Sequence, residues 1–184
     1  NGQLSNYLGF KKVTLLDISD SGIKIARKKF KYKAKKSDLL NESWPIREKY
    51  FDIAICNEFL EHVSFPSLIL SRINSCLKKR GTLYVAGPNM TPDGVHHVKR
   101  ITWSYLNQIL LENGFKIVAS IIVPKFLTLT FSEISFSKKP KDNLKIFFGA
   151  FLGIFFSKKT KFKLAKIFPN FFGGFYHIKA EKIN

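Results

Sequence analysis

Two short apolar runs that end abruptly in polar residues constrain the fold of this 184-residue chain most strongly. The first covers residues 13–18 and carries Asp17 near its end, and the second covers residues 51–56 and is followed by Asn57 and Glu58. Apolar runs of this length that do not alternate are typical of buried parallel strands, which present both faces to packed helices. Ligands of open α/β sheets bind beyond the carboxyl ends of such strands, so these polar residues predict a binding site.

Strand-like and helix-like patterns alternate along the rest of the chain. Further strands are expected at residues 32–39, 82–86, 115–123 and 174–183. Helices are expected at residues 4–9, 20–30, 66–77 and 102–113. Ser19 or Asp20 can cap the second helix, and Gly9 and Gly114 can end the first and the last. This alternation predicts an α/β fold with a doubly wound, mostly parallel sheet and helices on both faces.

The order and spacing of these segments resemble the class I S-adenosylmethionine-dependent methyltransferases. Residues 1–8 resemble the tail of the family's glycine-rich motif, residues 36–39 the acidic end of its third strand, and residues 77–89 its fifth strand. Residues 97–115 resemble its last helix and sixth strand. The resemblance implies a Rossmann-like sheet with an antiparallel last strand. The first strand is missing from the pattern, so we expect a domain that is incomplete at its N-terminus.

The resemblance also implies a single domain over residues 1–184 with a helical insertion at residues 124–174, before the last strand. Within the insertion, a phenylalanine-rich stretch at residues 144–156 is flanked by lysines. It is too short to span a bilayer, and it suits a helix in the interface of an anionic membrane over residues 142–163. The alternative is a lid over the substrate pocket that buries these aromatic side chains inside the protein.

S-adenosylmethionine is the cofactor that the resemblance implies, and three residues near the start of the chain are assigned to it. Gly2 would let the backbone approach the cofactor closely, although it could also simply start a helix. Asp17 would accept hydrogen bonds from both ribose hydroxyls, or it could cap the following helix instead. Ile18 would pack on the face of the adenine ring.

Four further residues are assigned to the cofactor by the same resemblance. Asp38 would accept a hydrogen bond from the adenine amino group, and Leu39 would flank the ring. Simple exposure to solvent, or a salt bridge with a neighbouring lysine, is the alternative for Asp38. Asn57 and Glu58 would face the methionine part of the cofactor.

Two histidines are candidates for a catalytic role. Glu58 and His62 are four residues apart, so one helical turn would stack their side chains and orient the imidazole. His62 could then take a proton from a hydroxyl or amine acceptor, or it could only cap or pack. His97, next to His96 in a loop after an expected strand, would border the acceptor pocket, although exposure to solvent is the default for loop histidines. Two histidines do not complete a metal site and no zinc-ligand spacing occurs, so no metal is expected.

Composition bears on the compartment and on the partners. The net charge of +18 predicts attraction to nucleic acid or to anionic lipid, although a bias toward lysine would give the same charge without a partner. The two cysteines, Cys56 and Cys76, make no disulfide framework. They fit a reducing, cytoplasmic location, with peripheral attachment at the inner face of the membrane if the insertion binds lipid.

The Leu60-Glu-His-Val63 motif and the basic, apolar insertion are similar to the quinone-biosynthesis O-methyltransferases. The resemblance therefore implies methyl transfer to a small acceptor. A lipophilic acceptor would explain an interfacial insertion, because the enzyme could then collect its substrate from the bilayer. An RNA methyltransferase that binds phosphate through the lysines of residues 24–36 is an alternative. The absence of an Asn-Pro-Pro-Tyr-like motif after residues 51–56 argues against an amino-directed DNA methyltransferase, but not against every RNA methyltransferase. A non-catalytic binding module with the same fold is a third interpretation.

Overall fold

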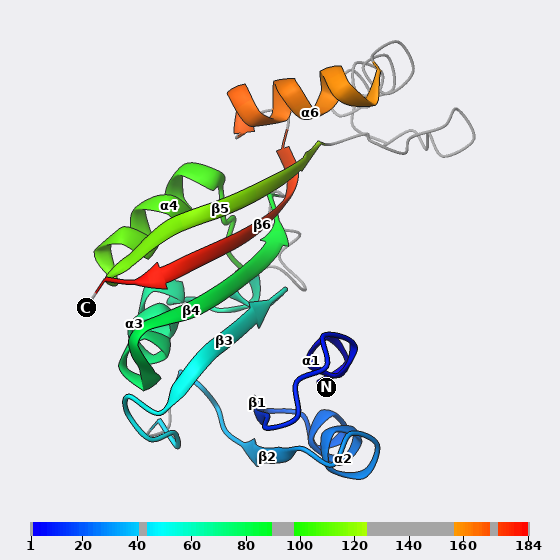
Figure 1. The fold of residues 1–184 in the computed structure, drawn as a ribbon, viewed down its shortest axis with the longest axis vertical. Helices are drawn as coiled ribbons and strands as arrows, with labels where there is room; N and C mark the ends of the chain where they lie inside the picture. The colour runs from blue at the N-terminus through cyan, green and yellow to red at the C-terminus, as the bar shows by residue number, and fades with distance from the viewer. Residues whose placement is uncertain (1, 41–43, 90–97, 125–156, 170–172, 184) are drawn as a thin grey trace. The chain divides into compact units, whose positions relative to one another are not determined.

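The computed structural model describes residues 2–40, 44–89, 98–124, 157–169 and 173–183 (Figure 1). The chain divides into two compact units, residues 1–48 and residues 49–184. Each unit has its own sheet, of two strands in the first and of four strands in the second.

The first unit contains a parallel pair of strands covered by an amphipathic helix. Its elements are α1 (Gln3–Tyr7), β1 (Thr14–Asp17), α2 (Asp20–Lys28) and β2 (Lys33–Lys36). β1 pairs with β2 in parallel, and Asp17 lies opposite Lys36 at the carboxyl end of the pair. α2 buries Ile23 and Ala26 in a small core with Ala34, while its lysines are exposed. The parallel pairing brings the carboxyl ends of both strands to one edge, as the sequence predicts.

Helix ends follow the capping residues expected from the sequence. The Ser19 hydroxyl accepts a hydrogen bond from the Gly22 N–H at 3.3 Å, so Ser19 is the N-cap of α2. Thr102, expected from the sequence to be the first residue of the last helix, instead caps α4 (Trp103–Glu112) in the same way. Gly9 and Gly114 follow α1 and α4 in left-handed conformations, with φ of 76° and 74°. These local signals fix the start of α2 just after Asp17.

The second unit is built on a four-stranded sheet in the order β3-β4-β6-β5. Its strands are β3 (Phe51–Asn57), β4 (Leu77–Pro88), β5 (Phe115–Pro124) and β6 (Gly173–Lys182). β3 and β4 are parallel, whereas β6 runs antiparallel to both β4 and β5. The prediction of an antiparallel last strand that pairs with the strand before it is therefore confirmed.

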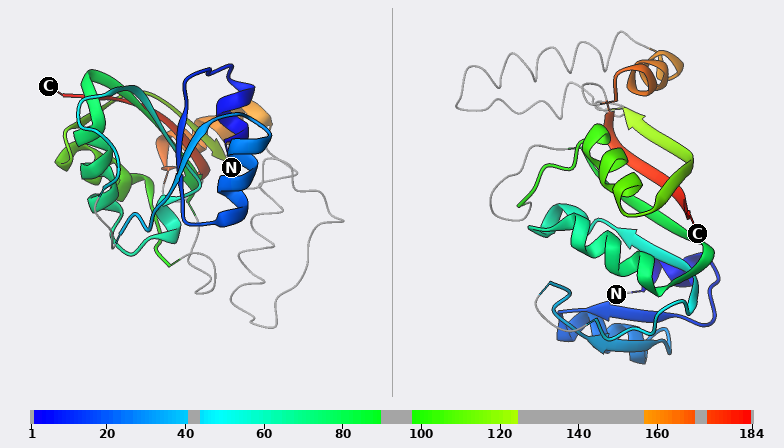
Figure 2. Two further views of the ribbon diagram at one scale, coloured as in Figure 1. Left: turned by 90° about the horizontal axis from the view of Figure 1, so that it is seen from below. Right: turned by 90° about the vertical axis from the view of Figure 1, so that its left-hand side faces the viewer.

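One face of this sheet carries the core of the second unit. Helices α3 (Pro66–Cys76) and α4 cover that face (Figures 1 and 2). Leu83 and Val85 of β4 are buried there, opposite Ala180 and Ile178 of β6. Tyr84, between them on β4, is exposed on the other face. Buried and exposed side chains therefore alternate along β4, as expected for a strand whose sheet is covered by helices on one face.

Helix α6 (Lys158–Ile167) lies between β5 and β6 in the sequence. The expected insertion before the last strand therefore contains a helix. Residues 125–156, which make up most of the insertion, lie outside the described residues.

Among the strands that the structure describes, β3 lies at one edge of its sheet, which differs from the central strand predicted for residues 51–56. Among the described strands it pairs only with β4, and Ile53 is 37% exposed. Asp52 on the same strand forms an exposed ion pair of 2.7 Å with Lys78. An apolar run reflects how well the faces of a strand are buried, but not whether both of its edges are paired. The pattern therefore could not place β3 within the sheet.

Candidate active site

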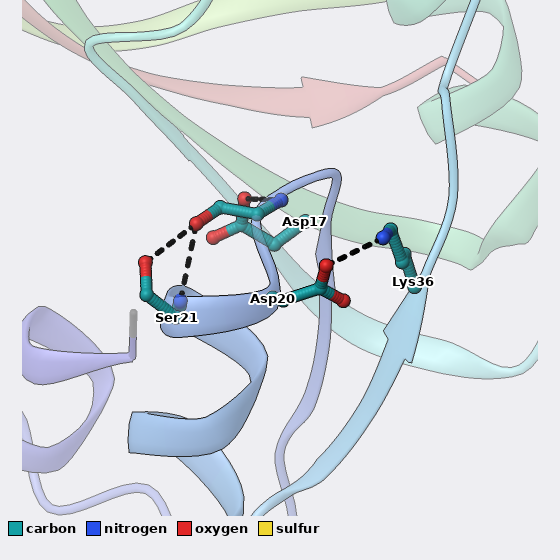
Figure 3. Close-up of polar contacts among 6 residues, drawn as sticks. Asp17, Asp20, Ser21 and Lys36 are labelled. Carbon is teal, nitrogen blue, oxygen red and sulfur yellow. Dashed lines mark hydrogen bonds and ion pairs between the residues drawn. The ribbon is translucent and has the colours of Figure 1, made fainter.

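Asp17 lies where β1 ends and α2 begins (Figure 3). Its Oδ1 atom accepts a hydrogen bond from the Ser19 N–H at 3.0 Å, in the turn that an aspartate makes with the backbone two residues on. Because Ser19 is the N-cap of α2, the alternative role of Asp17 as the cap is wrong. The carboxylate lies near the start of the helix, where peptide dipoles favour negative charge.

The backbone of Gly22 packs directly against the Asp17 carboxylate. A Cβ atom at Gly22 would overlap Asp17 Oδ2, so any larger residue there would displace the carboxylate. Gly22 is buried in the first turn of α2, where glycine is less favourable than alanine by about 1 kcal/mol. Sequence reasoning missed Gly22, and the signal that could have found it is a glycine placed near the start of a helix.

Asp38 and Leu39 follow β2 at the same edge of the first unit, and both are half-buried. Asp38 Oδ1 accepts a hydrogen bond from the Leu40 N–H at 3.1 Å. The neighbouring Lys36 forms an exposed ion pair of 2.7 Å with Asp20 (Figure 3). Asp38 is therefore not fully exposed to solvent, and its role at the adenine ring stays a prediction.

Gly2 and Ile18 occupy different settings in the first unit. Gly2 precedes α1 with φ of 83°, and a Cβ atom there would lie 3.1 Å from the Tyr32 ring. The contact with Tyr32 is enough to explain why residue 2 is a glycine. The predicted closeness of Gly2 to the cofactor stays a prediction. Ile18 follows Asp17, and its side chain is 63% exposed. An exposed apolar side chain beside Asp17 is available for contact with a ligand ring.

Asn57 and Glu58 lie at the carboxyl end of β3, and both are exposed. The Glu58 backbone has φ of 47°, a left-handed conformation that is uncommon for residues other than glycine. Its N–H donates a hydrogen bond of 2.7 Å to the carbonyl of Ala86 on β4. Strained residues of this kind concentrate at functional sites.

The predicted stacking of Glu58 on His62 is wrong. The chain after Phe59 forms a short 3₁₀ helix, η1 (Leu60–His62), so the two residues do not share an α-helical turn. His62 instead lies near Glu61, with 4.0 Å between His62 Nε2 and Glu61 Oε1. The His62 side chain is 41% exposed and that of Glu61 only 3%. A buried carboxylate therefore lies beside an imidazole that solvent can reach.

Glu61 belongs to a buried polar cluster with Cys56, Gly87 and Tyr176. Burial, and then the charge of Glu61, raise the pKa of the Cys56 thiol to about 12. Burial and the same charge also raise the pKa of the Tyr176 hydroxyl. The Glu61 carbonyl accepts a hydrogen bond of 2.9 Å from the Val98 N–H, which ties η1 to the segment before α4. Sequence reasoning missed Gly87 and Tyr176, because the pairing of distant strands leaves no local signal.

His97 and the adjacent His96 lie outside the described residues, as does the apolar stretch at residues 144–156. The roles expected for them stay predictions. Within the part of the chain that the structure describes, no group of three or more His, Cys, Asp or Glu side chains is arranged to hold a metal ion.

Comparison with known protein families relates the first part of the chain to one of them. Residues 1–85 match the model of a family described as a methyltransferase domain, a stretch that includes both Asp17 and the turn after β3. Residues 1–85 are therefore similar to a methyltransferase domain. No curated protein sequence matches this chain.

Solved structures with a similar fold include methyltransferases and a cyclase. An S-adenosylmethionine-dependent methyltransferase from Archaeoglobus fulgidus is 22% identical, with a TM-score of 0.59 over 92% of this chain and 75% of that one. The 1,6-didemethyltoxoflavin-N1-methyltransferase of Burkholderia thailandensis, solved with 1,6-didemethyltoxoflavin and S-adenosylhomocysteine, is 16% identical, with a TM-score of 0.58 over 100% of this chain and 67% of that one. The cyclase SpnF is 16% identical, with a TM-score of 0.61 over 98% of this chain and 71% of that one. These similarities confirm the Rossmann-like fold of the chain and leave any acceptor open.

Proposed function

We propose that this protein transfers the methyl group of S-adenosylmethionine to a small, lipophilic acceptor by in-line displacement. The observation that carries the proposal is the Asp17 carboxylate at the carboxyl end of β1, held by the Ser19 turn and by the backbone of Gly22. The neighbour from Burkholderia thailandensis, which is named for methylation of a small molecule, supports the choice of acceptor class.

In this proposal, the first unit binds the nucleoside part of the cofactor. Asp17 would accept hydrogen bonds from both ribose hydroxyls, because a carboxylate offers about four acceptor sites. The exposed side chain of Ile18 would pack against the adenine ring. Asp38 would accept a hydrogen bond from the adenine amino group, with Leu39 beside the ring. Gly2 would lie where the backbone approaches the cofactor.

We assign the methionine part of the cofactor to the turn after β3. Asn57 and Glu58 are both exposed there, and the left-handed backbone of Glu58 sets the direction of the chain. Contacts from backbone carbonyls would suit the ammonium group of the methionine part, because that group can only donate hydrogen bonds.

Methyl transfer depends more on the alignment of the acceptor with the cofactor than on reactive side chains. S-adenosylmethionine, when bound, supplies an electrophilic methyl group, so alignment of the acceptor with the methyl–sulfur axis provides most of the rate. A base is needed only when the acceptor atom still holds its proton. His62 would take that proton, because its imidazole is exposed and the Glu61 carboxylate can stabilise the resulting cation. We assign His97 to the border of the same acceptor pocket.

Calorimetry with S-adenosylhomocysteine tests the cofactor site. We expect Asp17→Asn to weaken binding by at least about tenfold, or about 1.4 kcal/mol, because the amide loses the charge and one acceptor oxygen. Asp52→Asn removes an exposed carboxylate of β3 and should bind as the wild type does. Equal affinities of Asp17→Asn and the wild type would exclude Asp17 from the ribose site.

A panel of lipophilic phenols and thiols, assayed with S-adenosylmethionine labelled on its methyl group, tests the acceptor class and the base. His62→Gln should lower kcat for phenols by about 10²–10⁴-fold, the usual contribution of a general base. Thiols ionise near neutral pH, so they should lose much less activity in the same variant. Equal losses for both classes would show that His62 does not act as the base.

We also propose that residues 142–163 bind an anionic membrane surface, which would make the protein cytoplasmic and peripheral to the inner face. In the described part of this segment, Lys158, Lys159 and Lys163 are exposed and Phe162 is 39% exposed. None of the helices in the described residues has the length and apolar character needed to cross a bilayer. Co-sedimentation with phosphatidylglycerol vesicles should be lost on deletion of residues 142–163. Equal binding by both forms would refute this role.

A further inference from the structure

Exposed lysines gather at the amino edge of the first unit, the edge where both of its strands begin. They come from three segments, which are the residues before β1, the end of α2 and the start of β2. Because β1 and β2 are parallel, α2 must run back between them, and its last residues lie at the same edge as the starts of both strands. We call this group the amino-edge lysines, and it consists of Lys11, Lys12, Lys28, Lys29, Lys31 and Lys33.

Hydrogen bonds hold these three segments together. The Tyr32 hydroxyl donates a hydrogen bond of 3.0 Å to the carbonyl of Phe10, and the Tyr32 N–H donates one of 3.0 Å to the carbonyl of Ala26 in α2. The Lys33 N–H donates a further bond of 3.2 Å to the carbonyl of Val13. The Tyr32 side chain is buried, whereas the lysines on either side of it are exposed. The amino-edge lysines are therefore presented by a folded surface.

Opposite charges are segregated within the first unit. The acidic residues among residues 1–40 all lie at the carboxyl edge, where Asp17 ends β1, Asp20 begins α2 and Asp38 follows β2. Figure 3 shows the first two of them beside Lys36, which pairs with Asp20. Among the residues that the structure describes, none of the amino-edge lysines has an acidic partner. A group of ammonium ions without interspersed carboxylates creates a positive potential that attracts polyanions.

The side chains between these lysines favour one class of polyanion. Among residues 10–13 and 26–36, every large apolar side chain is buried or half-buried, Phe30 and Tyr32 included. A membrane-surface helix inserts an exposed apolar face, and single-stranded nucleic acid stacks its bases on exposed aromatic rings. The amino edge offers neither of these features, so it can attract a partner only through charge. A nucleic-acid duplex presents closely spaced phosphates along its whole length and suits such a surface.

We infer that the amino edge of the first unit is a docking surface for the phosphate backbone of a nucleic-acid duplex. The surface does not read the base sequence, and the duplex anchors the protein without being its methyl acceptor. β2 has four residues, so about 10 Å of strand separates the lysine at its start from the edge that carries Asp17. The inference goes beyond the proposed methyl transfer and does not depend on it.

The salt dependence of binding to a short fluorescent DNA duplex, measured by anisotropy, tests this surface. Each lysine that contacts a phosphate contributes about 0.9 to the slope of log K against the logarithm of the salt concentration. Lys31→Gln/Lys33→Gln should therefore reduce the slope by about 2 and weaken binding at low salt by at least about tenfold. Lys11→Gln/Lys12→Gln, in a different segment, should have the same effect, so the test does not depend on one variant that folds.

Lys79→Gln/Lys116→Gln removes two exposed lysines of the second unit and is the charge-matched control, which should keep the wild-type slope. Equal slopes in the control and in both test variants would overturn the inference, because the amino-edge lysines would then contribute no more than any others. A second result against it is a loss of binding to phosphatidylglycerol vesicles in the test variants while their duplex binding stays that of the wild type, which would make the partner a membrane.

Two duplexes of unrelated sequence should bind with equal affinity, and a clear preference for one of them would show that bases are read. The duplex measurements use neither S-adenosylmethionine nor an acceptor. A protein that binds the duplex but not S-adenosylhomocysteine would refute the proposed function and leave the docking surface in place. The reverse result would refute the docking surface alone.

Discussion

The Gly22 Cα atom lies against the Asp17 carboxylate so closely that a methyl group on Gly22 would overlap Asp17 Oδ2. The contact couples two consecutive elements, because Asp17 ends β1 and Gly22 belongs to the first turn of α2. A glycine in this turn makes the helix less stable than alanine would. The position of the Asp17 carboxylate thus depends on a glycine that makes the first turn of α2 less stable than alanine would.

Gly22→Ala should separate stability from cofactor binding. The free energy of unfolding should rise by up to about 1 kcal/mol, because alanine favours the helix. Affinity for S-adenosylhomocysteine should fall by at least about tenfold, because the carboxylate is displaced. Urea denaturation and calorimetry measure the two effects, with Lys24→Ala on the exposed side of α2 as the control. Wild-type affinity in Gly22→Ala would show that Asp17 does not need this contact.

Gly87→Ala should destabilise the second unit. The added Cβ atom would lie 2.9 Å from Tyr176 Oη and 3.3 Å from Glu61 Oε2, and both side chains are buried. Overpacking of this kind costs about 1–3 kcal/mol, which urea denaturation can measure. Ala86→Ser, at the neighbouring and only half-buried position, should cost less. A Gly87→Ala protein as stable as the wild type would mean that the cluster can rearrange.

Alkaline pH should destabilise the folded protein through Cys56. The pKa of this thiol is about 12 in the folded state against an ordinary value of 9.0, so the unfolded chain loses the proton first as the pH rises. The stability that the protonated thiol contributes is complete below pH 9.0 and is lost as the pH rises toward about 12. The loss is up to about 1.4 kcal/mol for each pH unit.

Cys56→Ala should flatten this alkaline decline in urea denaturation measured over a series of pH values. Cys76→Ala should flatten it less, because burial raises the pKa of that thiol only to about 11. If Cys56→Ala declined with the slope of the wild type, another group would have to cause the alkaline transition.

Lys182 should stabilise the end of α3. Its Nζ atom donates hydrogen bonds of 2.8 Å and 3.0 Å to the carbonyls of Asn74 and Leu77, where α3 ends and β4 begins. Lys182→Met keeps the length of the side chain and removes the donors, so we expect a loss of about 1–2 kcal/mol of unfolding free energy. Lys179→Met, which removes a partly exposed ammonium of the same strand, is the control and should change stability little.

Features that depend on a few consecutive residues could be predicted from the sequence. Ser19 caps α2 because its hydroxyl meets an N–H group only three residues away. Gly9 and Gly114 end helices because glycine adopts the left-handed backbone without strain. The alternation of such segments is enough to predict the α/β class. The antiparallel direction of β6 came from the family resemblance.

Features that join distant residues could not be predicted in this way. The register that places Gly87 opposite Tyr176 depends on the whole of the β4–β6 pairing, and nothing in either segment indicates it. The stacking of Glu58 on His62 failed for a local reason, because an α-helical spacing was applied to a 3₁₀ turn. The cofactor contacts of Asp17 and of the other assigned residues stay predictions, since they depend on a ligand.

The place of β6 between β4 and β5 has a consequence for synthesis of the protein on the ribosome. When β5 has just been synthesised, β4 and β5 are both present, but β6, which pairs with both of them, has not yet been made. Their open edges are templates for aggregation until the residues from Gly173 onward have left the exit tunnel. Cells that make this protein therefore need to shield those edges co-translationally, and loss of the β6 segment should leave insoluble material rather than a smaller folded domain.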